Sequence, residues 1–260
     1  MLKDIKNSDL YLFNEKDYET FSQENLHSKD VEINNRRNMV RAKLIDLHLD
    51  IEDEIKKLNL NPHWNKRNIT ALPYITPRTE GTGINWIGLR YGRDRKTIKD
   101  MTADIPKVSD EDQEFSFLKF QCIQVGIDYE GMGISLFHSN PSNSFDRGYL
   151  HDKLKTDTKL KSKVIEEISK LKGYGIKWYT GNHIFNIDLE DAIKFIEFYD
   201  KYDEYNTYSF AEIIIPRWDS RLKKNEINNT VIDYVDLLTP LYETIKWKPN
   251  NYIHEKETSK

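Results

Sequence analysis

The chain has 260 residues, of which 38% are hydrophobic, 32% charged and 12% aromatic, and its formal net charge is −4. This length is sufficient for a substantial core, and the aromatic content argues against a disordered chain. The nearly balanced charge excludes a uniformly basic nucleic-acid coat protein, so any polyanion would have to bind to a local patch.

The first third of the chain is predicted to be helical. Asn14 is a good N-cap for a short helix, and apolar residues recur at helical spacing from about residue 30 to 58. The pattern then changes to short runs rich in β-branched and aromatic residues, which predict a meander of strands. These runs cover residues 69–76, 84–91, 115–128 and 131–137. Residues 128–133 are predicted to form a hairpin turn between the last two strands.

The second half returns to helical spacing. A short helix followed by a longer one is predicted up to Gly173, and a strand is predicted at 176–187. Asp188 is a good cap for the next helix, and a further strand is predicted to end at Pro216. The last helix is expected at about residues 225–246. Helices and strands in this order predict an α+β fold.

One compact domain covering residues 1–250, with a flexible tail at 251–260, is the simplest interpretation of this pattern. A subdivision near residue 142 is the alternative. Cys122 is the only cysteine and lies in an apolar run, where a small buried side chain is expected rather than a nucleophile. With neither a signal peptide nor a membrane-spanning segment apparent, the expected location is the cytoplasm.

A cluster of cations occupies the segment between Pro62 and Lys99, which contains eight Lys or Arg residues and only two acids. Guanidinium groups form charge-assisted hydrogen bonds with phosphates and carboxylates. Interleaved aromatic residues are typical of surfaces on which nucleobases stack. The sequence therefore predicts an anion-binding site in the strand and loop at 78–99, with ligand-binding residues Arg78, Arg90, Arg93, Arg95 and Trp86. The alternative is a solvated loop whose arginines pair with the acidic segment 109–114.

A metal-dependent nuclease or phosphohydrolase is a second hypothesis, with Glu80, Asp94 and Lys96 as candidate catalytic residues and Mg²⁺ as cofactor. The acid-x-lysine element of this constellation recurs elsewhere in the chain, so its specificity is low. No other cofactor and no dedicated metal ligands are predicted. His138 and His151 are a conceivable acid–base pair, although structural histidines are commoner.

The stretch from Arg90 to Asp100, RYGRDRKTIKD, resembles an R-x-x-R-D-x-R-x-x-K-D pattern found in a widespread family of uncharacterised bacterial proteins. The chain also resembles the related YktB-like family, through FNEKDYETF, NWIGL, FQCIQVGID, IIIPRWDSRL and LLTPLYE. This resemblance implies a curved, mostly antiparallel sheet flanked by helices. It implies no established activity.

The leading hypothesis is a cytosolic protein that binds an anionic ligand, nucleic acid or nucleotide, in phage–host conflict or nucleic-acid handling. The third hypothesis is a non-catalytic module that binds a protein partner through exposed aromatic residues. Its candidates are Trp64, Tyr205, Tyr208 and Trp218.

Overall fold

The computed structural model describes six stretches of the chain, residues 10–64, 68–76, 79–103, 119–138, 144–203 and 207–248. Contacts divide the chain into two compact units, each assembled from three segments. Unit 1 consists of Met1–Tyr91, Gln124–Ser135 and Ile213–Asp236, and unit 2 consists of Gly92–Ile123, Leu136–Glu212 and Leu237–Lys260. The unit boundary nearest to residue 142 thus falls between Ser135 and Leu136.

The described strands form an open, antiparallel sheet of seven strands in the order β1-β2-β3-β4-β7-β5-β6. Their bounds are β1 (Asn61–Pro62), β2 (Trp86–Gly92), β3 (Cys122–Asp128), β4 (Gly131–Phe137), β5 (Lys177–Thr180), β6 (His183–Asn186) and β7 (Ser209–Pro216). With the helices, this sheet confirms the predicted α+β class. No helix in the described stretches has the length and apolar character that a membrane span requires.

Seven α-helices are found in the described residues, and five of them begin at a side-chain cap. The helices are α2 (Glu15–Glu19), α3 (Val31–Lys57), α4 (Arg95–Met101), α6 (Phe145–Thr156), α7 (Thr158–Lys170), α8 (Lys194–Tyr202) and α9 (Ile227–Thr244). In each capped case a side-chain oxygen accepts a hydrogen bond from a backbone N–H of the first turn. The caps are Asn14, Asp30, Asp94, Ser144 and Asp157.

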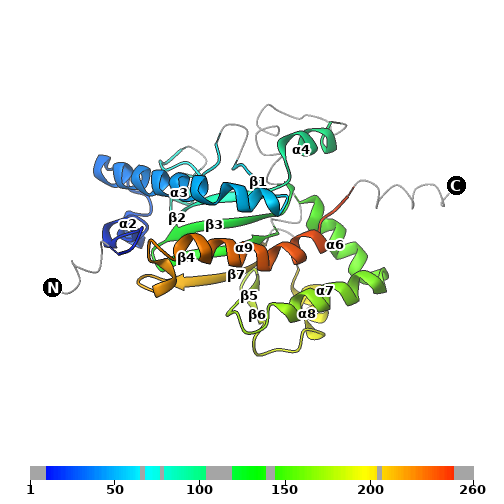
Figure 1. The fold of residues 1–260 in the computed structure, drawn as a ribbon. Coiled ribbons are helices and arrows are strands. Elements are labelled where there is room, and N and C mark those ends of the chain that lie inside the picture. Colours follow the sequence, from blue (N-terminus) through cyan, green and yellow to red (C-terminus); the bar gives the residue numbers. More distant parts are fainter. Residues whose placement is uncertain are drawn as a thin grey trace. The chain divides into compact units, whose positions relative to one another are not determined.

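In unit 1, the long helix α3 lies along strand β2 (Figure 1). Its apolar residues at helical spacing are buried, which is the stripe that the sequence predicted. They are Val40, Leu44, Leu47, Ile51 and Ile55. The hydroxyl of Tyr91, in β2, lies 3.3 Å from Nδ1 of His48, in α3. The helix and the strand therefore also share a buried polar contact.

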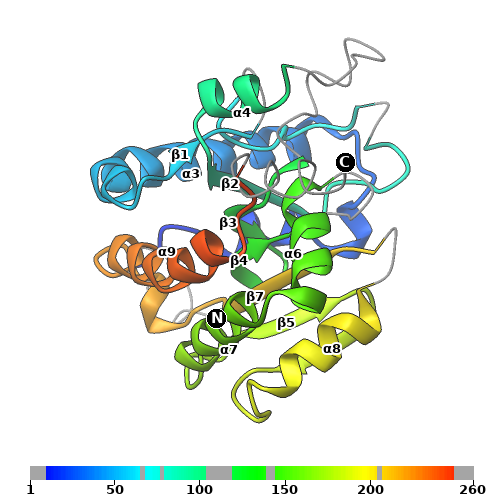
Figure 2. The same cartoon turned by 90° about the vertical axis from the view of Figure 1, so that its right-hand side faces the viewer.

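In unit 2, the core is built around Trp178 of β5, which is fully buried. Its ring lies edge-on to Phe195 of α8 at a centroid distance of 4.9 Å, and its Nε1 donates to Oγ of Ser209 at 2.9 Å. Figure 2 shows α7 and α8 next to each other beside β5. Helices α7 and α8 therefore pack together in this unit, and α8 also contacts β6.

Three predicted elements differ from the structure. Residues 69–76 contribute only an isolated bridge between Thr70 and Leu89 rather than a strand. The strand predicted at 176–187 is a hairpin, because Gly181 adopts a φ of +54° in the turn between β5 and β6. Asp188 does not cap a helix: its carboxylate accepts the backbone N–H groups of Gly173 and Gly175, and α8 starts later, at Lys194.

The segment after β2 is also different from its prediction as a basic loop. Residues Arg95–Met101 form α4, whose N-cap Asp94 accepts from the backbone N–H of Thr97 at 2.8 Å. Buried Ile98 anchors this helix to Phe120. The predicted acidic loop at 109–114 lies outside the described residues.

Candidate functional site

A buried ion pair organises one region of unit 2. Arg93, immediately after β2, donates from Nη1 to Oδ2 of Asp146 in the first turn of α6 at 2.8 Å, and from Nη2 to Oδ1. The same carboxylate accepts the backbone N–H of Gln121 at 2.8 Å and that of Trp247 at 2.7 Å. Four donors thus surround Asp146, whose side chain is completely buried. An ionised carboxylate with this many donors is fully satisfied.

Trp247 is fixed by this ion pair through both of its backbone polar groups. Its N–H is bound by Asp146, and its carbonyl oxygen accepts from Nη2 of Arg93 at 2.8 Å. Burial lowers the pKa of Arg93, but the charge and hydrogen bonds of Asp146 outweigh burial, so the pKa is raised. The guanidinium stays charged, and it holds the segment after α9 in place.

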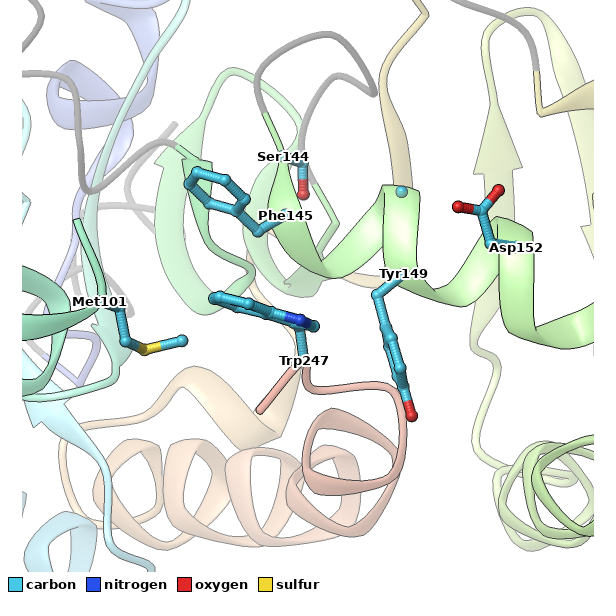
Figure 3. A pocket seen from close by; sticks show the side chains of 7 residues that line it. Met101, Ser144, Phe145, Tyr149, Asp152 and Trp247 are labelled. Carbon is cyan, nitrogen blue, oxygen red and sulfur yellow. The ribbon is translucent and has the colours of Figure 1, made fainter. Parts of the chain in front are cut away.

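The Trp247 side chain forms one wall of a pocket of about 370 Å³ (Figure 3). Its indole stacks on Phe145 with a centroid distance of 5.5 Å and an interplanar angle of 24°. Figure 3 shows Phe145 above Trp247, Met101 on one side of the indole and Tyr149 on the other. The remaining lining residues are Ser144, Gly148 and Asp152. This volume is within the range of small-molecule sites, which are commonly lined by aromatic side chains.

The pocket is mostly apolar, and its charge is negative. Asp152 is the charged residue in the lining, and its side chain is exposed. Within the described residues, no hydrogen bond or ion pair engages the Asp152 carboxylate. Ser144 already uses its Oγ to accept the backbone N–H of Arg147 at 3.1 Å. The lining therefore offers aromatic surface, the hydroxyl groups of Ser144 and Tyr149, and one carboxylate.

Helix α4, whose last residue Met101 belongs to the pocket lining, also carries exposed cations. Arg95 and Lys99 are exposed and lie one helical turn apart, so they share a face of α4. Lys96 forms an exposed ion pair with Asp100 at 2.7 Å. The exposed face of α4 thus carries two positively charged side chains, Arg95 and Lys99.

The predicted ligand-binding residues do not all occupy this region. Arg93 has the internal role described above, and Arg95 is exposed on α4. Arg90 is buried within β2 in unit 1, with 1% of its surface exposed. Arg78 lies outside the described residues.

The ring of Trp86, also in unit 1, packs against the backbone of β2 at Gly88 and of β3 at Gly126. A Cβ placed on Gly88 or Gly126 would lie 2.5 or 2.8 Å from its ring. The ring also contacts Trp64 edge-on at 5.3 Å.

The candidate catalytic residues each contact another partner. Glu80 forms an exposed ion pair with Lys29 at 2.6 Å, Asp94 caps α4, and Lys96 pairs with Asp100. In the stretches that the structure describes, no three His, Cys, Asp or Glu side chains are grouped so that they could hold a metal ion.

The two histidines singled out in the sequence have different surroundings. His138 is completely buried next to the rings of Trp178 and Tyr199, and burial, followed by the nearby Arg147 charge, lowers its pKa to about 3. His151 is partly exposed, with Nδ1 3.4 Å from Oδ2 of Asp203. A histidine that stays neutral at this depth is a structural group rather than a proton donor.

Aromatic side chains also line the outward face of the sheet in unit 2. Tyr179 of β5 stacks on its cross-strand partner Phe210 of β7 at 4.9 Å, and Phe137 of β4 contacts Tyr208 at 5.9 Å. Tyr208 is 63% exposed. This second surface contains one residue of the predicted interaction module, while Tyr205 lies outside the described residues.

Sequence reasoning missed the roles of Asp146, Phe145 and Trp247. A local signal for α4 existed in the spacing of Asp94 and Thr97, but the pairing of Arg93 with residues far along the chain left no local signal. A scan of protein-family models and a search of curated proteins find no match to this chain.

Proposed function

We propose that unit 2 binds a nucleotide unit, either free or within single-stranded nucleic acid. The observation that carries this proposal is the aromatic pocket of Phe145, Tyr149 and Trp247, which shares Met101 with the cationic helix α4. Stacking on aromatic side chains contributes about 1–3 kcal/mol per base and tolerates any sequence. The pocket would take the base.

The phosphate would bind outside the pocket, on Arg95 and Lys99. Neither Phe145, Tyr149 nor Trp247 carries charge, and the lining contains an acid rather than a cation. Lys99 precedes Met101 by two residues, which corresponds to about 3 Å along the helix axis and about 200° around it, so the phosphate would lie beside the pocket, on another face of α4. This arrangement supports the anion-binding hypothesis, with its cations on α4 rather than on β2.

The test is the binding of a fluorescently labelled, mixed-sequence single-stranded oligonucleotide at low salt, followed by anisotropy. We expect Trp247→Ala and the double variant R95A/K99A each to weaken binding at least tenfold. The matched control is K159A/K163A, which removes two exposed lysines one turn apart on α7. Absence of binding by the wild-type protein at low salt, or equal losses in the control, would contradict the proposal.

A second candidate function is binding of a protein partner through the outward sheet face. The aromatic pairs Tyr179–Phe210 and Phe137–Tyr208 favour it, because large aromatic side chains are enriched in protein interfaces. A stoichiometric partner that is retained by R95A/K99A and lost by Tyr208→Ala would support this function over the first. No contact among the described residues favours the nuclease hypothesis.

A further inference from the structure

Gly148, the fourth residue of α6, is not explained by the fold. A glycine inside a helix is unfavourable relative to alanine. A Cβ added at Gly148 would have no neighbour within 4 Å, so packing in the described structure does not require the missing side chain. Gly148 is, however, part of the pocket lining. A bare backbone at such a position lets a ligand approach closely.

The neighbours of Gly148 define the shape of this surface. Ser144, the N-cap of α6, lies four residues before Gly148, and Asp152 lies one turn after it, so Gly148 and Asp152 follow one stripe of the helix that begins at its cap. Phe145 and Tyr149 lie on the adjacent stripe, and both also line the pocket. A flat ring placed over Gly148 would therefore have aromatic side chains along one side and the Asp152 carboxylate at one end.

The Asp152 carboxylate would favour planar ligands that present hydrogen-bond donors to it. When ionised it can only accept hydrogen bonds, so the ligand must present donors to it. Guanine presents two adjacent donors, N1–H and the N2 amino group, which match the two oxygens of a carboxylate. Adenine and cytosine place an unprotonated ring nitrogen beside their amino group, and uracil places a carbonyl on each side of its single N–H. These acceptors would face the negative charge.

We propose that Gly148 and Asp152 form a guanine-binding position, which rests on the proposed nucleotide-binding function and adds the identity of the base. Gly148 admits the ring, and Asp152 accepts from its two donors. An organic ammonium ion would also suit aromatic rings beside a carboxylate. The stacked pair Phe145–Trp247, with 24° between its rings, offers a flat surface rather than a cage, which favours a planar base.

The first experiment is competition of GMP, IMP, AMP, CMP and UMP against the labelled oligonucleotide, with tetramethylammonium as a further competitor. We expect GMP to compete at least tenfold better than AMP, CMP and UMP, and IMP, which lacks the N2 amino group, to fall between them. Asp152→Asn should abolish this preference, because an amide also presents a donor to the base.

The second experiment tests Gly148 with Gly148→Ala and Gly148→Leu. We expect the alanine variant to weaken GMP competition and the leucine variant to abolish it, while both retain the wild-type circular dichroism spectrum. Gly81→Leu is the control, because a Cβ at Gly81 also has no neighbour within 4 Å.

The outcomes separate the two proposals. Equal competition by all five nucleotides would overturn the guanine assignment and leave nucleotide binding standing. Unchanged GMP competition in Gly148→Leu would overturn the role of Gly148. Displacement by tetramethylammonium but not by GMP would replace the base with a cationic ligand. If neither the oligonucleotide nor any mononucleotide binds, both proposals fail.

Discussion

The guanidinium of Arg93 and the carboxylate of Asp146 form a two-point ion pair inside unit 2, and both also bind the backbone of Trp247. Three segments far apart in the sequence, 93, 121 and 247, thus converge on one carboxylate. Arg93 and Asp146 therefore hold the backbone of Trp247, whose side chain is one wall of the pocket.

Replacing Asp146 should destabilise the protein severely. In Asp146→Asn the Arg93 charge stays buried without its counter-ion, and removal of one partner of a buried ion pair costs about 3–5 kcal/mol. Urea denaturation followed by circular dichroism measures the loss. Asp200→Asn, which changes an exposed acid of α8, should remain within about 0.5 kcal/mol of wild type. A similar small effect for Asp146→Asn would show that the ion pair contributes little to stability.

Gly148→Ala should have the opposite effect on stability. The added methyl group meets no neighbour, and alanine is favoured over glycine inside a helix, so the free energy of unfolding should rise by about 0.5–1 kcal/mol. A thermal melt followed by circular dichroism reports the change. A lower melting temperature would indicate a packing role for Gly148, and the binding losses of its variants would then no longer identify a ligand position.

Local sequence patterns predicted much of the fold. The boundaries of β4 at Gly131–Phe137 and the end of β7 at Pro216 match the prediction, because both depend on alternation and on the turn residues beside them. The helix α3 at Val31–Lys57 was predicted from its apolar stripe. α4 was missed because five cations within ten residues indicated an anion-binding loop, although Asp94 supplies the cap of a helix.

The site could be predicted only in part. Arg95 belongs to the cationic segment that the sequence singled out, whereas the acid that pairs with Arg93 is 53 residues away and the carbonyl it binds is 154 residues away. Such pairings depend on the order of strands and on the path of the chain after α9. Neither residue periodicity nor local charge contains that information.

The salt dependence of oligonucleotide binding should reveal the contribution of α4. Each phosphate contact in single-stranded nucleic acid contributes about −0.7 to the slope of log K against log salt concentration, because counterions are released. R95A/K99A should therefore make the slope shallower by about 1.4. Anisotropy titrations at several salt concentrations give this value. An unchanged slope, with the same loss at every salt concentration, would exclude phosphate contacts by these two residues.

His138 should make the protein less stable in mild acid. Its folded pKa of about 3 lies below the ordinary value of 6.5, because burial and then the Arg147 charge disfavour the protonated ring. Between these two values the unfolded chain binds a proton that the folded chain does not, so stability is complete above pH 6.5 and decreases as the pH falls toward 3.

The expected loss from this one residue is about 2 kcal/mol at pH 5 relative to pH 8. His138→Phe keeps a ring between Trp178 and Tyr199 and removes the titrating group, so its unfolding free energy should change less over this range. Urea denaturation of both proteins at pH 8 and pH 5 gives the difference. His48, whose pKa burial also lowers, is present in both proteins and cancels. Parallel pH profiles would mean that His138 is protonated in the folded protein, contrary to its surroundings.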